Sequence, residues 1–344
     1  MGISMVTDKN IILLALSITI ISCHGNTGTE KRHNHRNNLI HVQEQIKEIQ
    51  FEDAYLSNFA RIFTMDDYLI VRDYKSMEKL IYIFDRNNFS YIANIAPRGQ
   101  GPHEITNIGH IGIDEKNHLF YVTDHGKQKI FSYHLDSVLA DPSYKPVEKL
   151  NLNELQFPNK YVLLNDTLCI GQIIEPTGSY GFNQSIAKWN INSGEIIPMK
   201  YTHPEIERKR VSFAVSKENG IYVECYHHHD LFTICDLDGN LKYNIYGRKW
   251  DSTTSNAKQY FGDVIICNNR ILASFSDGMD RTFSNDDLPA QLLVFDINGN
   301  YINTLETGYR IINLCYDDRN DRLVMHFDDM IQFGYLTLDD NLLN

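Results

Sequence analysis

The chain is poor in positive charge. Its 344 residues include 32 Lys and Arg against 44 Asp and Glu, which gives a formal net charge of −12. A broad nucleic-acid or anionic-membrane footprint is therefore excluded, because either partner requires a basic surface that displaces counterions. We expect no nucleic acid among the partners of this protein.

Cysteine is scarce and irregularly spaced. Beyond Cys23, near the start of the chain, the cysteines are Cys169, Cys225, Cys235, Cys267 and Cys315. They are odd in number, show no short paired spacing, and fall in predicted strands beside apolar residues, where a free cysteine behaves as a small hydrophobe. This pattern excludes a disulfide framework and a zinc site.

Motifs of common enzymes are also missing. The sequence contains no Gly-x-Ser-x-Gly elbow, no His-Glu-x-x-His pair and no phosphate-binding glycine loop. The acidic segment 277–287 lacks the regular oxygen-ligand spacing of a helix-loop-helix calcium site. We predict no cofactor; calcium held by carboxylates from separate loops is the alternative.

Long apolar runs are limited to one near the start. Lys9 precedes an apolar run over residues 11–21, which is too short to span a hydrocarbon core of about 30 Å. The run ends in Ile20, Ile21, Ser22 and Cys23, which resembles a bacterial lipobox. We therefore expect a lipoprotein signal peptide over 1–22, lipidation of Cys23 and a flexible tether over 23–41. An ordinary signal peptide with a chance cysteine is the alternative.

What the chain does contain is a repeat. In residues 95–124 a turn rich in glycine and proline leads into a strand, a turn and a second strand, and the second half of this stretch recurs about every fifty residues. A polar turn precedes each second strand, as in a hairpin. The residues that open the six second strands are Leu69, Leu119, Leu168, Ile221, Ile271 and Leu323.

A third strand follows in each unit and often ends in a turn led by Asp or Asn. Such side chains bend the backbone through their own hydrogen bonds, as expected at Asp85, Asn190, Asp236 and Asp296. Short fourth strands are predicted over 91–95, 195–199, 241–246 and 301–305.

Four strands per unit and six units predict an all-β fold, a six-bladed β-propeller of four-stranded antiparallel blades over 42–344. The last unit lacks an outer strand after Leu336. We predict that an N-terminal strand within 42–51 supplies it and closes the ring, so that no sheet edge stays open.

These residues also carry a family resemblance. The turn from Arg98 to Glu104, with Val122, Thr123 and Asp124 after it, resembles the NHL-type repeat. The chain is similar to six-bladed β-propeller lipoproteins of Gram-negative bacteria, with NHL or TolB-like repeats, that carry an Arg-Gly-x-Gly-Pro-Gly-Glu-Phe turn. It departs from that turn at His103 and Ile105, where the family has Gly and Phe. The resemblance implies a fold more firmly than an activity.

Ligands are expected at the channel mouth, among the loops that join fourth to first strands and second to third strands. Arg98 and Glu104 have a structural alternative, since both can hold their own turn, and Asp124 can cap the next turn. The run His227–His229 would bind a metal only if alternate side chains converged with ligands from elsewhere. The candidate ligand-binding residues are Arg98, Glu104, Asp124, Tyr180, His229, Asp277, Arg281 and Arg310.

The sequence leaves three functional hypotheses. We favour a lipid-anchored protein of the bacterial outer membrane or cell envelope that recognises a glycan or a protein partner on the loop face without chemistry. Aromatic residues such as Tyr180, Phe182 and Phe283 would stack on the ligand. The alternatives are a metal-dependent hydrolase or lyase with its site at the channel mouth, and a structural component of an envelope complex.

Overall fold

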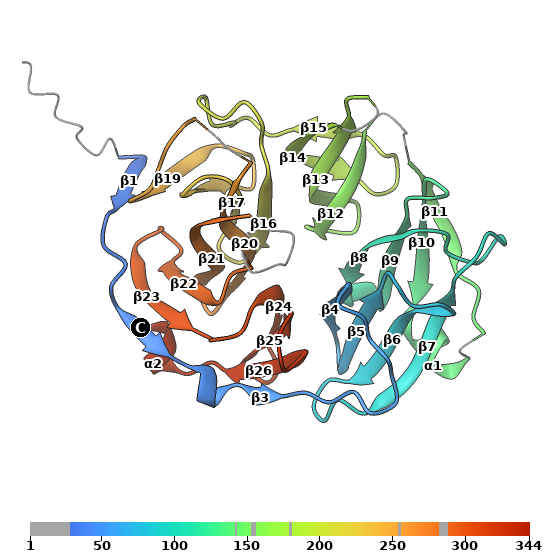
Figure 1. Ribbon diagram of the computed structural model, residues 1–344. Helices are drawn as coiled ribbons and strands as arrows, with labels where there is room; N and C mark the ends of the chain where they lie inside the picture. Colours follow the sequence, from blue (N-terminus) through green and yellow to red (C-terminus); the bar gives the residue numbers. More distant parts are fainter. Residues whose placement is uncertain (1–27, 142, 153–155, 179–180, 254–255, 282–287) are drawn as a thin grey trace, which may run out of the picture.

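Six β-sheets surround a central channel in a computed structural model of the chain (Figure 1). The structure describes residues 28–344 except 142, 153–155, 179–180, 254–255 and 282–287. The expected signal peptide over 1–22 and Cys23 lie outside the described residues. The predicted six-bladed propeller is confirmed, and the blades follow one another around the ring in chain order.

Each blade contains four antiparallel strands, of which the first lies innermost. The first three blades are blade 1, with β4 (Ala60–Met65), β5 (Tyr68–Asp73), β6 (Lys79–Asp85) and β7 (Tyr91–Pro97); blade 2, with β8 (Ile108–Asp114), β9 (Leu119–Asp124), β10 (Lys129–His134) and β11 (Val147–Asn151); and blade 3, with β12 (Phe157–Leu163), β13 (Leu168–Pro176), β14 (Phe182–Asn190) and β15 (Ile196–Pro198).

Each of the other three blades takes one strand from the N-terminal segment. They are blade 4, with β16 (Val211–Ser216), β17 (Ile221–Tyr226), β18 (Leu231–Asp236), β19 (Leu241–Gly247) and β1 (Glu30–His33); blade 5, with β20 (Lys258–Cys267), β21 (Arg270–Asp280), β22 (Gln291–Asp296), β23 (Tyr301–Glu306) and β2 (Leu39–His41); and blade 6, with β24 (Ile311–Asp317), β25 (Arg322–Phe327), β26 (Phe333–Thr337) and β3 (Lys47–Glu48).

The second strands are largely buried because neighbouring blades cover both of their faces. In β17 every residue from Ile221 to Tyr226 is buried, and in β25 every residue from Arg322 to Phe327 is buried. A strand covered on both faces reads as a continuous apolar run rather than an alternating one. The six predicted second-strand openings all lie at or within one residue of the start of a second strand.

The core is divided among the junctions between blades. Each of six buried apolar clusters joins two neighbouring blades, so that the ring holds together through side-chain contacts between adjacent sheets. At the junction of blades 6 and 1, for example, Val324 and Phe333 pack against Ile62 and Leu69.

The turns between third and fourth strands have the predicted chemistry. The Oδ1 atom of Asp236 accepts hydrogen bonds from the backbone N–H groups of Asp238 and Asn240, at 2.9 Å each. Asp296 does the same for Asn298 and Asn300. Asp85 and Asn190 each accept from the second and third residues that follow.

An N-terminal strand closes the ring, as predicted. Lys47 and Glu48 in β3 pair with Tyr335 and Gly334 in β26. The backbone N–H of Ile49 continues this pairing by donating to the carbonyl oxygen of Phe333 at 2.9 Å. Blade 6 therefore combines the start and the end of the propeller, and its outer edge is covered.

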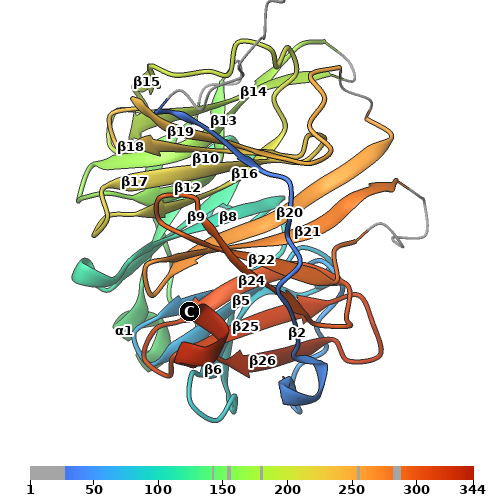
Figure 2. The same cartoon turned by 90° about the vertical axis from the view of Figure 1, so that its left-hand side faces the viewer.

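The expected flexible tether over 23–41 differs from the structure where that segment is described. β1 pairs in parallel with β19 and β2 pairs in parallel with β23, so the segment crosses the outer edges of blades 4 and 5 (Figure 2). Its polar composition suggested disorder, but its charges find partners. Lys31 lies 4.0 Å from the ring centroid of Tyr243, and the Arg36 guanidinium lies 2.8 Å from Asp230.

Helices are short and lie in the connections or, for the last one, after the final strand. They are η1 (Gln43–Gln45), η2 (Glu115–Asn117), α1 (Leu135–Ala140) and α2 (Asp340–Leu343). Helix α1 separates β10 from β11, a fourth strand that the sequence pattern did not reveal. Among the described residues no helix has the length and apolar character needed to cross a membrane.

Candidate functional site

A cavity of about 950 Å³ occupies the propeller channel. The first strands of all six blades line it, and the ends of several second strands contribute at the loop-bearing end. In a first strand, alternate side chains turn toward opposite faces of the blade, and the residues nearest the axis reach into the channel.

One polar residue from each blade lies at nearly the same level of the channel wall. Each follows or precedes apolar residues of its own first strand, and together they form what we call the polar ring. Its members are Arg61, His110, Lys160, Ser212, Asp263 and Asn313. No charged residue of this ring was among the candidates selected from the sequence.

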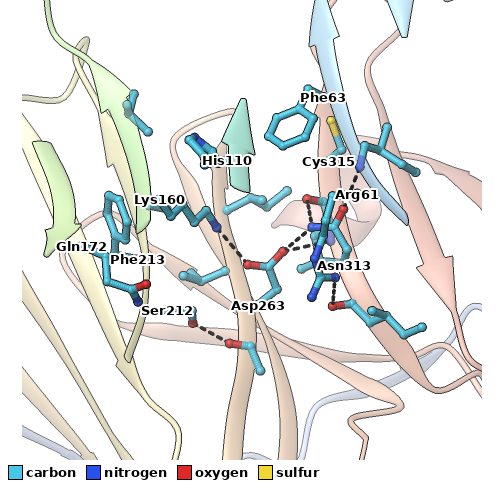
Figure 3. A pocket seen from close by; sticks show the side chains of 18 of the residues that line it. Arg61, Phe63, His110, Lys160, Gln172, Ser212, Phe213, Asp263, Asn313 and Cys315 are labelled. Atoms are coloured by element: carbon cyan, nitrogen blue, oxygen red, sulfur yellow. Dashed lines mark hydrogen bonds and ion pairs between the residues drawn. The ribbon is translucent and has the colours of Figure 1, made fainter. Parts of the chain in front are cut away.

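Asp263 binds two other members of the polar ring, Lys160 and Asn313 (Figure 3). Lys160 approaches it from blade 3 at 3.2 Å, Asn313 Nδ2 donates to it at 2.8 Å and the Leu314 backbone N–H donates at 3.1 Å. Burial alone would raise the pKa of Asp263, but the charges of Lys160 and Arg61 and these hydrogen bonds outweigh burial and lower it. Asp263 is therefore ionised at neutral pH.

Two arginines of blade 1 lie side by side at the loop end of the channel. Arg61 in β4 and Arg72 in β5 are direct register partners. Arg61 donates to the carbonyl oxygen of Ile312 at 2.8 Å and Arg72 to that of Ile108 at 3.4 Å. The Nε atom of Arg72 is buried and has no hydrogen-bond partner among the described residues.

Both guanidinium groups stay charged. Burial, followed by the neighbouring charge of Arg61, lowers the pKa of Arg72 to about 10. Burial also lowers the pKa of Arg61, and the charge of Asp263 opposes that shift. The charge of Asp73 likewise opposes the pKa shift of Arg72, and two neighbouring cations in a partly dehydrated wall are costly to the extent that anions do not balance them.

Positive charge exceeds negative charge along the described wall. Its charged residues are Arg61, Arg72, Lys160 and Arg281 against Asp263. This balance is opposite to that of the whole chain, which carries a net charge of −12. The channel therefore favours anions, whereas the protein as a whole repels them.

Three histidines of the wall are neutral at pH 7. Burial lowers the pKa of His110 to about 3, assisted by Lys160, and lowers that of His227 to about 4, assisted by His228. Burial lowers the pKa of His125 as well, although Asp124 opposes the shift. The Nδ1 atom of His125 is buried and finds no partner in the described part of the chain.

Away from the loop end, the channel wall becomes apolar. Its lining there includes Phe63, Ile113, Leu163, Val215, Ile266 and Tyr316. The site thus has a charged upper part and an apolar lower part, as expected of a binding cavity with a few polar groups that orient a ligand.

Three of the residues selected from the sequence hold loops. The Glu104 carboxylate accepts the Gly101 N–H at 2.7 Å, and Arg98 donates to the Ser76 carbonyl oxygen at 3.1 Å. Asp124 is fully buried and accepts from the backbone N–H groups of Thr106, Asn107, Gly126 and Lys127. These contacts match the structural alternative considered for all three residues.

The other candidates are spread over the loop face. His229 is buried beside Trp250, and its Nδ1 lies 2.9 Å from the Asp251 carbonyl oxygen. Asp277 pairs with Lys249 at 2.9 Å.

Arg310 donates to the Asp328 carbonyl oxygen at 2.9 Å. Arg281 alone of the described candidates lines the channel, and Tyr180 lies outside the described residues.

The histidine run does not converge. His227 lines the channel, whereas His229 packs against Trp250. Within the described ranges, no three side chains of His, Cys, Asp or Glu are grouped so that they could hold a metal ion.

Sequence reasoning missed the polar ring because it searched the loops. A signal was present in the first strands. Counted back from the openings of the second strands, the six polar-ring residues fall eight to ten positions upstream in every unit. One isolated polar residue in a strand is unremarkable, but six at equivalent positions of a closed ring must meet at its axis.

Comparisons with known proteins support the fold. The DUF5128 family model, described as a 6-bladed beta-propeller, matches residues 31–163. No curated protein matches the chain. The sequence-based resemblance is thus supported for the propeller, whereas the lipoprotein assignment and the NHL or TolB-like repeat stay predictions.

Two solved bacterial structures are similar over most of the chain. A DUF4221-family protein of Bacteroides vulgatus is 11% identical with a TM-score of 0.61, and the match covers 86% of this chain and 95% of that one. A candidate exported protein of Bacteroides fragilis is 11% identical with a TM-score of 0.51, over 87% of this chain and 88% of that one. At this identity the likeness is one of fold: the chain is a six-bladed β-propeller.

Proposed function

We propose that this protein is a binding protein of the bacterial cell envelope that takes an anionic ligand into the loop end of its channel. The observation that carries the proposal is the Arg61–Arg72 pair, with a buried Nε that lacks a partner among the described residues. Guanidinium groups bind carboxylates and phosphates through two parallel hydrogen bonds, and Lys160 and Arg281 add positive charge to the same wall.

The envelope location rests on two observations. The segment that ends at Cys23 resembles a lipobox, and the similar protein of Bacteroides fragilis is a candidate exported protein. A lipid on Cys23 would be the only membrane attachment that the proposal requires.

Binding is favoured over cysteine-dependent chemistry. All five described cysteines are buried and unpaired, and burial raises the pKa of Cys169, Cys267 and Cys315 to about 12. A thiol with such a pKa is protonated at neutral pH and is a poor nucleophile.

Titration calorimetry with citrate, phosphate and sulfate at low ionic strength tests the proposal. We expect binding of at least one of these anions and at least a tenfold loss of affinity in the double variant Arg61→Gln/Arg72→Gln. The double variant Arg98→Gln/Arg310→Gln is the matched control, because it removes the same charge from loops outside the channel. Equal losses in both variants, or no binding of any anion, would overturn the proposal.

A further inference from the structure

Above the arginine pair, blade 1 carries an exposed pair of aromatic rings. Phe59 lies in the turn two residues before Arg61, and Tyr74 lies in the turn two residues after Arg72, so both rings lie just beyond the loop ends of the paired strands β4 and β5. Their centroids are 6.2 Å apart, and their exposed fractions are 55% and 37%. The Lys75 ammonium lies 5.2 Å from each ring centroid.

The loop end of blade 1 therefore presents two kinds of binding group, the aromatic pair in the turns and the arginine pair in the strands. The aromatic pair lies nearer the loops than the arginine pair, because Phe59 and Tyr74 lie outside the strands that carry Arg61 and Arg72. A ligand that enters along blade 1 meets flat apolar surface first and two guanidinium groups next.

We infer that the ligand is an acidic glycan, with a carboxylate on Arg61 and Arg72 and a neighbouring sugar ring on Phe59 and Tyr74. The inference rests on the proposed function and names its ligand class. A sugar ring offers an apolar C–H face to an aromatic ring, and a uronate offers a planar carboxylate to a guanidinium group. The unpartnered Nδ1 of His125 lies on the same channel wall, where a sugar hydroxyl can reach it.

An acidic peptide fits the same wall less well. A peptide that added itself to an inner strand would need free carbonyl groups along that strand. Side chains of the protein already occupy several of them. Arg72 bonds the carbonyl of Ile108, Arg61 that of Ile312, and His110 that of Tyr161. Gln172 and Gln184 both donate to the carbonyl oxygen of Val211.

The inference is tested by titration calorimetry with a galacturonic acid hexasaccharide, maltohexaose as its neutral counterpart, poly-glutamate and sulfate. We expect the acidic hexasaccharide to bind at least tenfold more tightly than maltohexaose or poly-glutamate. Phe59→Ala/Tyr74→Ala should weaken that binding about three- to tenfold per ring, and leave sulfate binding unchanged. Val147→Ala/Ile197→Ala, which trims exposed apolar side chains elsewhere, is the matched control.

The outcomes separate this inference from the proposed function. If sulfate binds through the arginine pair but the aromatic variant binds the hexasaccharide as the unmodified protein does, the glycan inference fails and the anion site stands. Equal affinity for maltohexaose or poly-glutamate likewise overturns the inference. If none of the anionic probes binds, both fail.

Discussion

Asp317 pairs with two buried arginines at the junction of the first and last blades. Its carboxylate lies 2.6 Å from Arg86 of blade 1 and 2.7 Å from Arg322 of blade 6, and the side chains of Asp317 and Arg86 are almost fully buried. Arg86 also donates to the Asp66 carbonyl oxygen at 2.8 Å. Blades 1 and 6 are therefore linked by these ion pairs, in addition to the backbone pairing of β3 with β26.

Removing this carboxylate should weaken ring closure. We expect Asp317→Ala to lower the free energy of unfolding by about 3–5 kcal/mol, because Arg322 is left buried without its anion and Arg86 keeps only the exposed carboxylate of Asp318. Urea denaturation followed by circular dichroism measures the change. The control is Asp166→Ala, which removes an exposed pair with Lys116 between blades 2 and 3. A similar stability in both variants would contradict the assigned role of Asp317.

His326 gives the protein an acid-sensitive core group. It is fully buried, its Nδ1 lies 3.1 Å from the Ala60 carbonyl oxygen, and burial together with Arg61 lowers its pKa to about 4. A base whose pKa falls on folding takes up its proton more readily when unfolded. Its contribution is therefore fully present above about pH 6.5 and is lost as the pH falls toward 4.

We expect stability to decline below pH 6.5 with a slope of up to about 1.4 kcal/mol per pH unit from this histidine. The variant His326→Gln should show a shallower decline between pH 6.5 and 4, measured by urea denaturation at closely spaced pH values. An unchanged slope in the variant would exclude His326 as a source of the acid sensitivity.

At the scale of the element, the N-terminal segment acts as a strap across blades 4, 5 and 6 through β1, β2 and β3. Arg36 lies between β1 and β2, bonds Asp230 and lies 5.0 Å from the ring centroid of Phe275. Asp230 is almost completely buried, so Arg36 neutralises a charge that the fold has removed from water.

We expect Arg36→Ala to destabilise the protein by about 3 kcal/mol and to release the strap first. Limited proteolysis should then cut within residues 28–41 while the blades stay intact. Lys31→Ala, which removes exposed contacts to Asn298 and Tyr243 in the same segment, is the control. Cleavage that begins inside a blade in the Arg36 variant would contradict this order of release.

The strap also shows where sequence reasoning stopped. The second strands were predictable because both of their faces are buried, which leaves an apolar run that recurs with the repeat, as in 221–226. Turns such as that after Asp236 were predictable because their chemistry is local. β1 and β2 gain their order from distant backbone edges and charges, and nothing in their own polar sequence encodes those partners.

The residues of the candidate site were likewise only partly predictable from the sequence. Arg281 was selected from the sequence and lines the channel, whereas the Arg61–Arg72 pair was not selected. Loop residues such as Glu104 form hydrogen bonds within their own turn, and a sequence motif can indicate such bonds. The site residues on the first strands come together only because the closed ring brings six strands to one axis, and the sequence of a single repeat does not show this.

For the whole molecule, ring closure sets the charge pattern. An acidic exterior surrounds a channel whose described wall has four cations, Arg61, Arg72, Lys160 and Arg281, against one carboxylate, Asp263. The low-dielectric wall lets these charges act over a longer distance than they would in water. We expect an anion bound in the channel to favour protonation of the neutral histidines in this wall.

We therefore expect affinity for sulfate to rise as the pH falls from 7.5 to 5, because a bound anion raises the pKa of His110, His125 and His227. Their low pKa values in the free protein mean that protons enter with the anion, which favours binding at lower pH. Sulfate keeps its charge over this range, so a pH dependence measured by calorimetry reports the protein. Replacing His110 and His227 with glutamine should flatten the dependence, whereas His229→Gln, outside the channel, should not. An affinity that is constant or falls on acidification would show that the anion does not bind near these histidines.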